Sequence, residues 1–210
     1  MQDTSALLEQ CAPNASPLLM QAIVRAESSW QPLAIGMDAG SAPVGQPRTL
    51  AEAVTQVKAL SASGRGFSVG LAQIHVSNVV RYGLSWEQAF DPCLNLWTGQ
   101  EILRGFHRRA LTVGLTGLAG VRAALRGYNA GSIGRRAGER YAQRVIAYAA
   151  AGRPSVPTAG SEPAANALSA VSPQPRGAPL GHPVAGPDAG TTGGTEAPDI
   201  FMRQPQVQGF

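Results

Sequence analysis

Large apolar side chains are distributed unevenly along this chain of 210 residues, and this limits where a core can form. All three tryptophans, all four tyrosines and both cysteines precede residue 152. Ten of the 16 prolines and nine of the 25 glycines follow that point. A segment of that kind cannot bury enough apolar surface to offset its ordering entropy. We therefore predict one folded domain over residues 1–151 and a disordered Pro/Gly/Ala-rich tail over residues 152–210.

The charges follow the same division. The tail carries three arginines and four acidic residues, so 14 of the 17 basic and nine of the 13 acidic residues lie in the domain. A net charge near +5 favours nucleic acid, a membrane surface or an acidic polymer as surroundings, or simply keeps the domain soluble. The arginines are spread out, lack interleaved aromatic residues and form no known binding motif, so we expect no nucleic-acid partner.

Neither a membrane anchor nor a leader is visible in the sequence. No stretch approaches the ~20 apolar residues of a membrane-spanning helix, so we expect no transmembrane segment. The first residues, MQDT, have no basic start and no apolar stretch behind them, as a signal peptide would. Either export uses another route, or a leader is missing from this sequence.

Helix signals recur through the domain, whereas strand signals are almost absent, so the fold is predicted to be mainly α with six to seven helices. Ser16-Pro17 is a helix start, and apolar residues then repeat at helical spacing until Pro32 stops the helix. Residues 33–48 form an irregular loop. Further helices are predicted at about 50–62, from near 73, and at about 86–91, 92–109, 118–126 and 139–150.

Capping residues support several of these starts. Thr49 with Glu52, and Ser85 with Gln88, have the spacing of capping boxes. The stretch YNAG at 128–131 follows the 118–126 helix, where a glycine can supply a left-handed turn.

Glu27 lies in the last turn of the helix that begins at Pro17, one residue past Ala26 and at the edge of its apolar stripe. The negative end of the helix dipole disfavours a charged carboxylate there, and apolar neighbours act in the same direction. We therefore expect the pKa of Glu27 to lie above the ~4.3 of a free glutamate. A raised pKa suits a general acid.

Cys11 and Cys93 are the only cysteines, and neither has a CxxC neighbour. Two distant cysteines and three scattered histidines do not match the spacing of a metal site, so none is expected. In an oxidising compartment the two cysteines can form a disulfide, and otherwise they are two buried thiols.

Four short motifs on the predicted helices occur in an order that resembles a known family. They are Glu27-Ser28, GLAQI at 70–74, YNAG at 128–131 and YAQRV at 141–145. With the cysteine-bearing segments at 11–13 and 90–96, they resemble the lysozyme-like lytic transglycosylases, in particular the VirB1-type members of type IV secretion and conjugation systems. The resemblance covers roughly residues 8–150. It implies a goose-type, transglycosylase-like helical domain with a cleft, and the tail lies outside it.

The resemblance implies cleavage of the β-1,4 bond between N-acetylmuramic acid and N-acetylglucosamine in peptidoglycan, with formation of a 1,6-anhydro ring. The C6 hydroxyl of the sugar attacks in place of water, so one carboxyl is enough where an ordinary glycosidase needs two. The reaction needs no cofactor and no metal. Implied partners are peptidoglycan strands and, through the tail, secretion-system components. The implied location is the periplasm or cell envelope, where Cys11 and Cys93 can form a disulfide.

Roles for individual residues follow from matching the motifs. Glu27 would be the acid and base. Gln73 would line the cleft and hydrogen-bond sugar groups, and Tyr128 would place its hydroxyl near the Glu27 carboxyl and orient it. Asn129 either contacts substrate or serves the turn, and Ser28 either hydrogen-bonds in the cleft or caps the helix end.

The sequence also departs from the family pattern. Ala72 replaces a usual methionine, His75 stands where asparagine is common, and Ser68 stands where an aspartate is frequent. We assign His75 no role and expect Tyr141 to be a core residue flanking the cleft. The departures at Ala72 and Ser68 motivate one alternative to a lytic transglycosylase, a glycan-binding scaffold of the secretion system with weak or no activity. A lysozyme-type hydrolase, which would leave ordinary reducing ends, is the other alternative.

Overall fold

The computed structural model describes residues 4–152, and these form eight α-helices, one 3-10 turn and a three-stranded sheet. The mainly α prediction is confirmed, with more helices than the six to seven expected. The elements are α1 (Thr4–Cys11), α2 (Pro17–Glu27), β1 (Ile35–Met37), α3 (Leu50–Ala62), β2 (Phe67–Val69), β3 (Ile74–His75), α4 (Val76–Arg81), α5 (Trp86–Phe90), α6 (Pro92–Thr112), α7 (Gly117–Ala130), η1 (Arg136–Gly138) and α8 (Glu139–Ala151).

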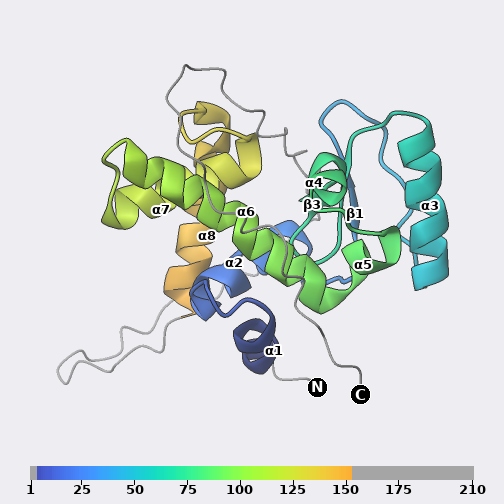
Figure 1. Cartoon of the computed structure of the whole chain (residues 1–210), viewed down its shortest axis with the longest axis horizontal. Coiled ribbons are helices and arrows are strands. Elements are labelled where there is room, and N and C mark those ends of the chain that lie inside the picture. The colour runs from blue at the N-terminus through green and yellow to red at the C-terminus, as the bar shows by residue number, and fades with distance from the viewer. Residues whose placement is uncertain (1–3, 153–210) are drawn as a thin grey trace, which may run out of the picture.

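The long helix α6 crosses the middle of the molecule and separates two cores (Figure 1). One core lies among helices, where α6 packs on α7 and α2 packs on α8. The other lies between the sheet, α3 and α5. Ile102 of α6 packs against both cores. The helix can be this long because Asp91 caps its start, accepting from the Leu94 N–H at 2.8 Å, and Pro92 occupies its first turn.

The small antiparallel sheet was not predicted. Its strands lie in the order β1-β2-β3, and Ser68 of β2 faces Gly36 on one side and His75 on the other. Each strand has only two or three residues and all of them are buried, so no alternation of apolar and polar side chains marks them in the sequence. The sheet therefore depends on its tertiary surroundings and not on a local pattern.

The end of α7 differs from the prediction. The helix continues to Ala130, so Tyr128 and Asn129 lie in its last turn and not in a turn that follows it. Gly127 lies inside the helix and serves packing, since a Cβ at this position would overlap the Phe106 ring of α6. Gly131 supplies the left-handed residue, with φ of 76°, that ends the helix.

Several helix starts also differ in detail. The helix expected from near residue 73 begins at Val76, since His75 is extended and caps it by accepting from the Ser77 N–H. Ser16 precedes α2 without a side-chain capping bond. Thr49 caps α3 as predicted, but the Glu52 carboxylate accepts from the N–H of residue 48 and not of Thr49. The capping box at Ser85 and Gln88 is confirmed.

The N-terminal helix α1, which the sequence analysis did not predict, is attached to the domain by a covalent bond. Cys11 at its end forms a disulfide with Cys93 in the first turn of α6, across a sequence separation of 82 residues. In the chain-entropy treatment, closing a loop of that length stabilises the folded state by about 4–5 kcal/mol. The disulfide closes the loop that contains α2, the sheet and α5, and so holds the end of α1 against the start of α6.

The predicted tail lies outside the described residues apart from Gly152, which follows α8. Among residues 4–152, no helix combines the length and apolar character needed to cross a membrane.

Candidate active site

Glu27 is the last residue of α2, and the helix end around it is firmly fixed. Met20, Ile23 and Val24 of the same helix are fully buried in the helical core. The next residue, Ser28, donates from both its N–H and its Oγ to the Val24 carbonyl, at 3.0 and 3.2 Å. Of the two roles predicted for Ser28, the structure shows the capping one; a contact with substrate stays a prediction.

Burial raises the pKa of Glu27 from an ordinary 4.5 to about 7. A hydrogen bond from the Tyr141 hydroxyl and the positive charge of Arg144 act in the opposite direction, but desolvation outweighs them. The direction is the one expected from the helix end and the apolar neighbours. Near neutral pH this carboxyl is therefore present in both protonated and charged forms, as a group that gives and takes protons must be.

Two buried tyrosines lie beside this carboxyl. The rings of Tyr128 (α7) and Tyr141 (α8) stack with centroids 6.4 Å apart and an angle of 10°. Burial raises the pKa of both hydroxyls well above the usual value, and the nearby charge of Glu27 adds to the effect. Both tyrosines therefore stay protonated and can donate hydrogen bonds at any physiological pH.

The two tyrosines differ in their contacts, and the predicted orienting contact of Tyr128 with the Glu27 carboxyl stays a prediction. Tyr128 donates its hydroxyl to the Ala72 carbonyl at 2.7 Å, while the hydrogen bond of Tyr141 to Glu27 lowers the pKa of the carboxyl. Tyr141, predicted to be only a core residue, thus contacts the acid as well as the core. The motif YAQRV at 141–145 was the available signal for it.

The turn that carries Gln73 is held by Asn95 of α6. The fully buried Asn95 amide donates to the Val69 and Ala89 carbonyls at 3.0 and 2.7 Å and accepts from the Ala72 N–H at 2.7 Å. Gly70 makes this approach possible: its φ is 78°, and a Cβ there would overlap the Asn95 amide. The sequence analysis gave Asn95 no role, although a polar side chain within a buried helix stripe is a signal for one.

Gln73 is buried and has a left-handed backbone, with φ of 48°. Its Nε2 donates to the Ala34 carbonyl at 3.1 Å and to the Gly70 carbonyl at 2.9 Å. Both amide N–H groups thus bond to backbone carbonyls, and the bond to Ala34 links this turn to the residue just before β1. Contact with a sugar, as predicted for Gln73, is left to its Oε1 atom.

Asn129 lies next to Tyr128 in the last turn of α7 and is 5% exposed. Gly131 supplies the left-handed residue of the turn that follows, and whether the Asn129 side chain supports that turn stays a prediction. Its contact with substrate stays a prediction.

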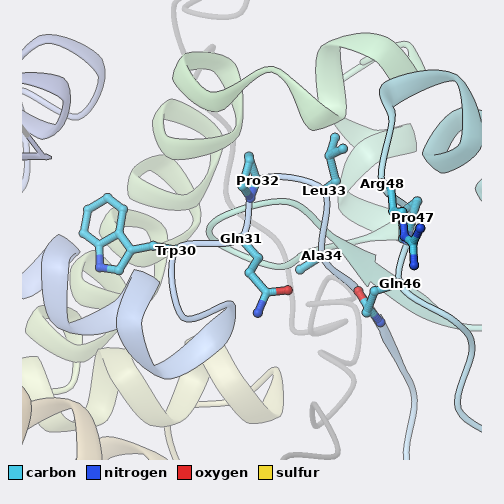
Figure 2. Close-up of a pocket in the computed structure, with 8 residues that line it drawn as sticks. All are labelled: Trp30, Gln31, Pro32, Leu33, Ala34, Gln46, Pro47 and Arg48. Atoms are coloured by element: carbon cyan, nitrogen blue, oxygen red, sulfur yellow. The ribbon is translucent and has the colours of Figure 1, made fainter. Parts of the chain in front are cut away.

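A pocket of about 330 Å³ opens three residues beyond Glu27 (Figure 2). Trp30 lies at one end of it, residues 46–48 lie at the other, and residues 31–34 run between them. The Gln46 side chain pairs with both main-chain groups of Ile35, accepting at 2.9 Å and donating at 2.8 Å, as a neighbouring strand would. This pairing fixes the wall that carries Pro47 and Arg48.

Backbone strain is concentrated around this pocket. Ser29, Trp30 and Gln73 are the only residues other than glycine with positive φ in the described part of the chain, at 51°, 67° and 48°. Two of them, Ser29 and Trp30, lie two and three residues after Glu27 and lead the chain into the pocket wall. Such conformations cost of order 1–3 kcal/mol each and are typical of functional sites.

His75 has a structural role, and the described residues offer no metal site. His75 caps α4, and its Nε2 atom lies 3.4 Å from the Oδ2 atom of Asp38. Both contacts hold the fold. Within residues 4–152, no cluster of three histidine, cysteine or acidic side chains is arranged to hold a metal ion.

The comparison with known proteins identifies the domain. The transglycosylase SLT domain matches residues 6–149, which include every residue discussed above. The chain belongs to the transglycosylase SLT domain family. The predicted resemblance to lysozyme-like transglycosylases is thereby confirmed.

Individual relatives of this transglycosylase domain are also similar. The chain is 41% identical over 150 residues to the type IV secretion system protein virB1 of Brucella abortus, Brucella melitensis and Brucella suis. The aligned region is 68% of this chain and 62% of each relative, so the chain spans less than two thirds of their length. No solved structure matches the chain.

Replacing Asn95 by Ala tests how the site is held. The change leaves two carbonyls and one N–H without their buried partner, so we expect the free energy of unfolding to fall by about 3 kcal/mol in urea denaturation. Hydrogen exchange at the Ala72 N–H should become faster. Thr98→Ala, which removes one bond within α6, is the matched control and should cost about 1 kcal/mol. Equal effects of the two variants would contradict the role given to Asn95.

Proposed function

We propose that this domain is a lytic transglycosylase that cleaves the β-1,4 bond between N-acetylmuramic acid and N-acetylglucosamine in peptidoglycan and leaves a 1,6-anhydro end. The observation that carries the proposal is Glu27: a buried carboxyl with a pKa of about 7, three residues before Trp30 in the wall of a pocket of about 330 Å³. Membership of the transglycosylase SLT domain family supports it.

The chemistry needs one group that first gives and then takes a proton. Protonated Glu27 donates its proton to the oxygen of the bond that breaks, so the leaving sugar departs with a hydroxyl. The Glu27 carboxylate then accepts the proton of the C6 hydroxyl as that oxygen bonds to the anomeric carbon. The glutamate ends in its starting form, and no water is consumed.

The surroundings of Glu27 favour this route over ordinary hydrolysis. An ordinary glycosidase places a second carboxyl about 5–9.5 Å from the first, as nucleophile or base. The residues that line the described pocket, and the groups that shift the Glu27 pKa, include no second carboxylate. A nucleophile supplied by the substrate fits that arrangement.

The pocket itself suits a sugar unit. Trp30 and Pro32 offer apolar faces for a pyranose ring, while the Arg48 guanidinium offers donors for the hydroxyl and amide oxygens of the glycan. The Ala72 departure removes a methionine side chain but keeps both main-chain bonds of residue 72, to Asn95 and Tyr128. The frame behind Glu27 is therefore complete without the methionine.

The biological setting follows from the relatives. Similarity to type IV secretion system protein virB1 supports a role in opening the cell wall locally for a secretion or conjugation apparatus. We propose the periplasm or cell envelope as the location, peptidoglycan as the substrate and secretion-system components as partners.

Substitution of Glu27 by Gln tests the chemistry. The amide keeps the shape but cannot donate the proton, so turnover of purified peptidoglycan should fall by at least about 10²-fold. Mass spectrometry of the muropeptides from the wild-type digest should show 1,6-anhydro ends. The control is Glu9→Gln, an exposed glutamate on α1, which should leave turnover unchanged.

Two results would redirect the proposal. Reducing ends in place of anhydro ends would identify a lysozyme-type hydrolase. Peptidoglycan binding without product, in the wild type and in Glu27→Gln alike, would identify the glycan-binding scaffold.

Substitution of Tyr141 by Phe tests the hydrogen bond to the acid. Because the protonated carboxyl starts the reaction, kcat/KM of the wild type should fall as the pH rises through about 7. The Tyr141 bond favours the charged carboxylate, so its removal should raise the pKa and move that fall to higher pH. Tyr148→Phe, on the same helix and half-buried, should not move it. An unchanged profile in Tyr141→Phe would show that the hydrogen bond does not act on the reacting group.

The tail from residue 152 is proposed as a flexible linker or partner-docking segment outside the catalytic domain, on the strength of its Pro/Gly/Ala composition. Limited proteolysis that removes it should leave peptidoglycan turnover unchanged. Loss of turnover on trimming would show that the segment belongs to the enzyme.

A further inference from the structure

The connection between α6 and α7 exposes an unusual amount of apolar surface. Leu111, Val113 and Leu118 are 45%, 63% and 62% exposed, and they lie within eight residues of one another along the chain. The described part of the chain has only two other exposed large apolar residues, Leu50 and Val80. We call the segment 111–118 the apolar tip.

The apolar tip lies at one end of the molecule. In Figure 1, α6 and α7 meet at the left edge, at the opposite end from α3. The tip is therefore remote from the sheet and from the pocket wall that follows β1, and a body that docks on it would leave the pocket open.

Arginines flank the apolar tip on both helices at a regular distance. Arg108 precedes Leu111 by three residues on α6, and Arg122 follows Leu118 by four residues on α7. Side chains with these spacings lie on the same helix face. Each exposed leucine thus has an arginine one turn, about 5 Å, further from the tip.

The positive charge of this region is in excess. From residue 102 to residue 138 the chain contains no aspartate or glutamate and seven arginines. Arg108 and Arg109 are exposed and form no ion pair with another described residue; Arg109 lies over the Phe106 ring instead. Glu139 contacts Arg122 and Arg126 together at 3.5 Å, so one acidic group serves two basic ones.

We propose that the apolar tip docks on a bilayer surface that contains anionic phospholipids. A short apolar tip with arginines one turn behind it matches the depth profile of a lipid interface, where apolar side chains enter about 5–10 Å and arginines reach back to the phosphates. The guanidinium fork pairs with phosphate oxygens. Charge complementarity favours this occupant, because the excess of arginines would face the anionic headgroups.

Docking through the apolar tip would fix the orientation of the domain relative to the membrane. With the tip on a membrane, α3 and the pocket residues 46–48 that precede it would lie at the end of the domain away from the lipid. The inference does not depend on the proposed catalytic function, because vesicle binding is measured without turnover.

Vesicle co-sedimentation of the full chain tests the inference. Binding to vesicles of equal parts phosphatidylglycerol and phosphatidylcholine should exceed binding to pure phosphatidylcholine at least about tenfold, and should weaken at about 0.5 M salt. Val113→Ser should weaken it about tenfold through lost apolar burial, and Arg108→Gln about fivefold.

Matched controls lie at other places on the surface. Val80→Ser changes a valine that is 72% exposed on α4, and Lys58→Gln removes an exposed charge on α3. Both should bind vesicles like the wild type, and circular dichroism should show all four variants folded. Because every substituted residue is exposed, loss of folding does not complicate the comparison.

Three outcomes would overturn the inference: equal binding to the two kinds of vesicle, binding that Val113→Ser leaves unchanged, or equal losses in tip and control variants. Tighter binding to soluble polyglutamate than to the vesicles, dependent on Arg108 but not on Val113, would assign the surface to an acidic protein and would overturn it too.

Discussion

The side chain of Asn95 joins α6 to the segment 69–72 and to α5, and the candidate site depends on this junction. Its amide contacts the end of β2, the end of α5 and the turn that carries Gln73. Ala72 in that turn then accepts the hydroxyl of Tyr128, whose ring stacks on Tyr141, and the Tyr141 hydroxyl reaches Glu27. The acid on α2 is thus positioned by α6, α7 and α8 together. Gly99 of α6 permits a further close approach in this network, since a Cβ there would overlap the Ala72 methyl group and crowd the Tyr128 hydroxyl.

The protonation of Glu27 reflects a balance between opposing effects. Burial in the helical core favours the neutral acid, while the Tyr141 hydroxyl and the Arg144 charge favour the carboxylate. Complete burial without these two groups would keep the carboxyl neutral, and a solvated carboxyl would already be charged at neutral pH. The balance at a pKa of about 7 leaves both forms accessible, which is what a single group needs if it is to act first as acid and then as base.

Strained backbone conformations in this domain lie next to hydrogen bonds that hold the chain in place. The left-handed residues Ser29, Trp30 and Gln73 each have an unfavourable backbone, and each lies at a point where the chain is otherwise fixed. Ser28 is bonded to Val24, and the Gln73 amide is bonded to the Ala34 and Gly70 carbonyls. Gln46, paired with Ile35, fixes the facing wall of the pocket. The disulfide and the two cores supply the stability that these local costs require.

Local signals in the sequence determined most of the helices and the position of Glu27 at a helix end. The Ser85–Gln88 box, the Asp91-Pro92 start and the apolar spacing before Glu27 act over a few residues, so they can be identified without a structure. The raised pKa of Glu27 was also foreseeable in direction, because a helix end and apolar neighbours both act on it from nearby in the chain.

Only the tertiary structure decided the sheet, the end of α7 and the partners of the site residues. The strands are too short and too uniformly buried to show an alternation of apolar and polar residues. Gly127 suggests a helix end in the sequence, but in the structure the Phe106 ring of α6 occupies the space that a side chain at this position would need. The same holds for Asn95 and Tyr141, since Asn95 bonds to Val69 and Ala72, 26 and 23 residues away, and Tyr141 acts on Glu27 of α2. Backbone conformation and capping depend on neighbours in sequence, whereas hydrogen-bond partners and desolvation depend on neighbours in space, and these are set only when the helices pack.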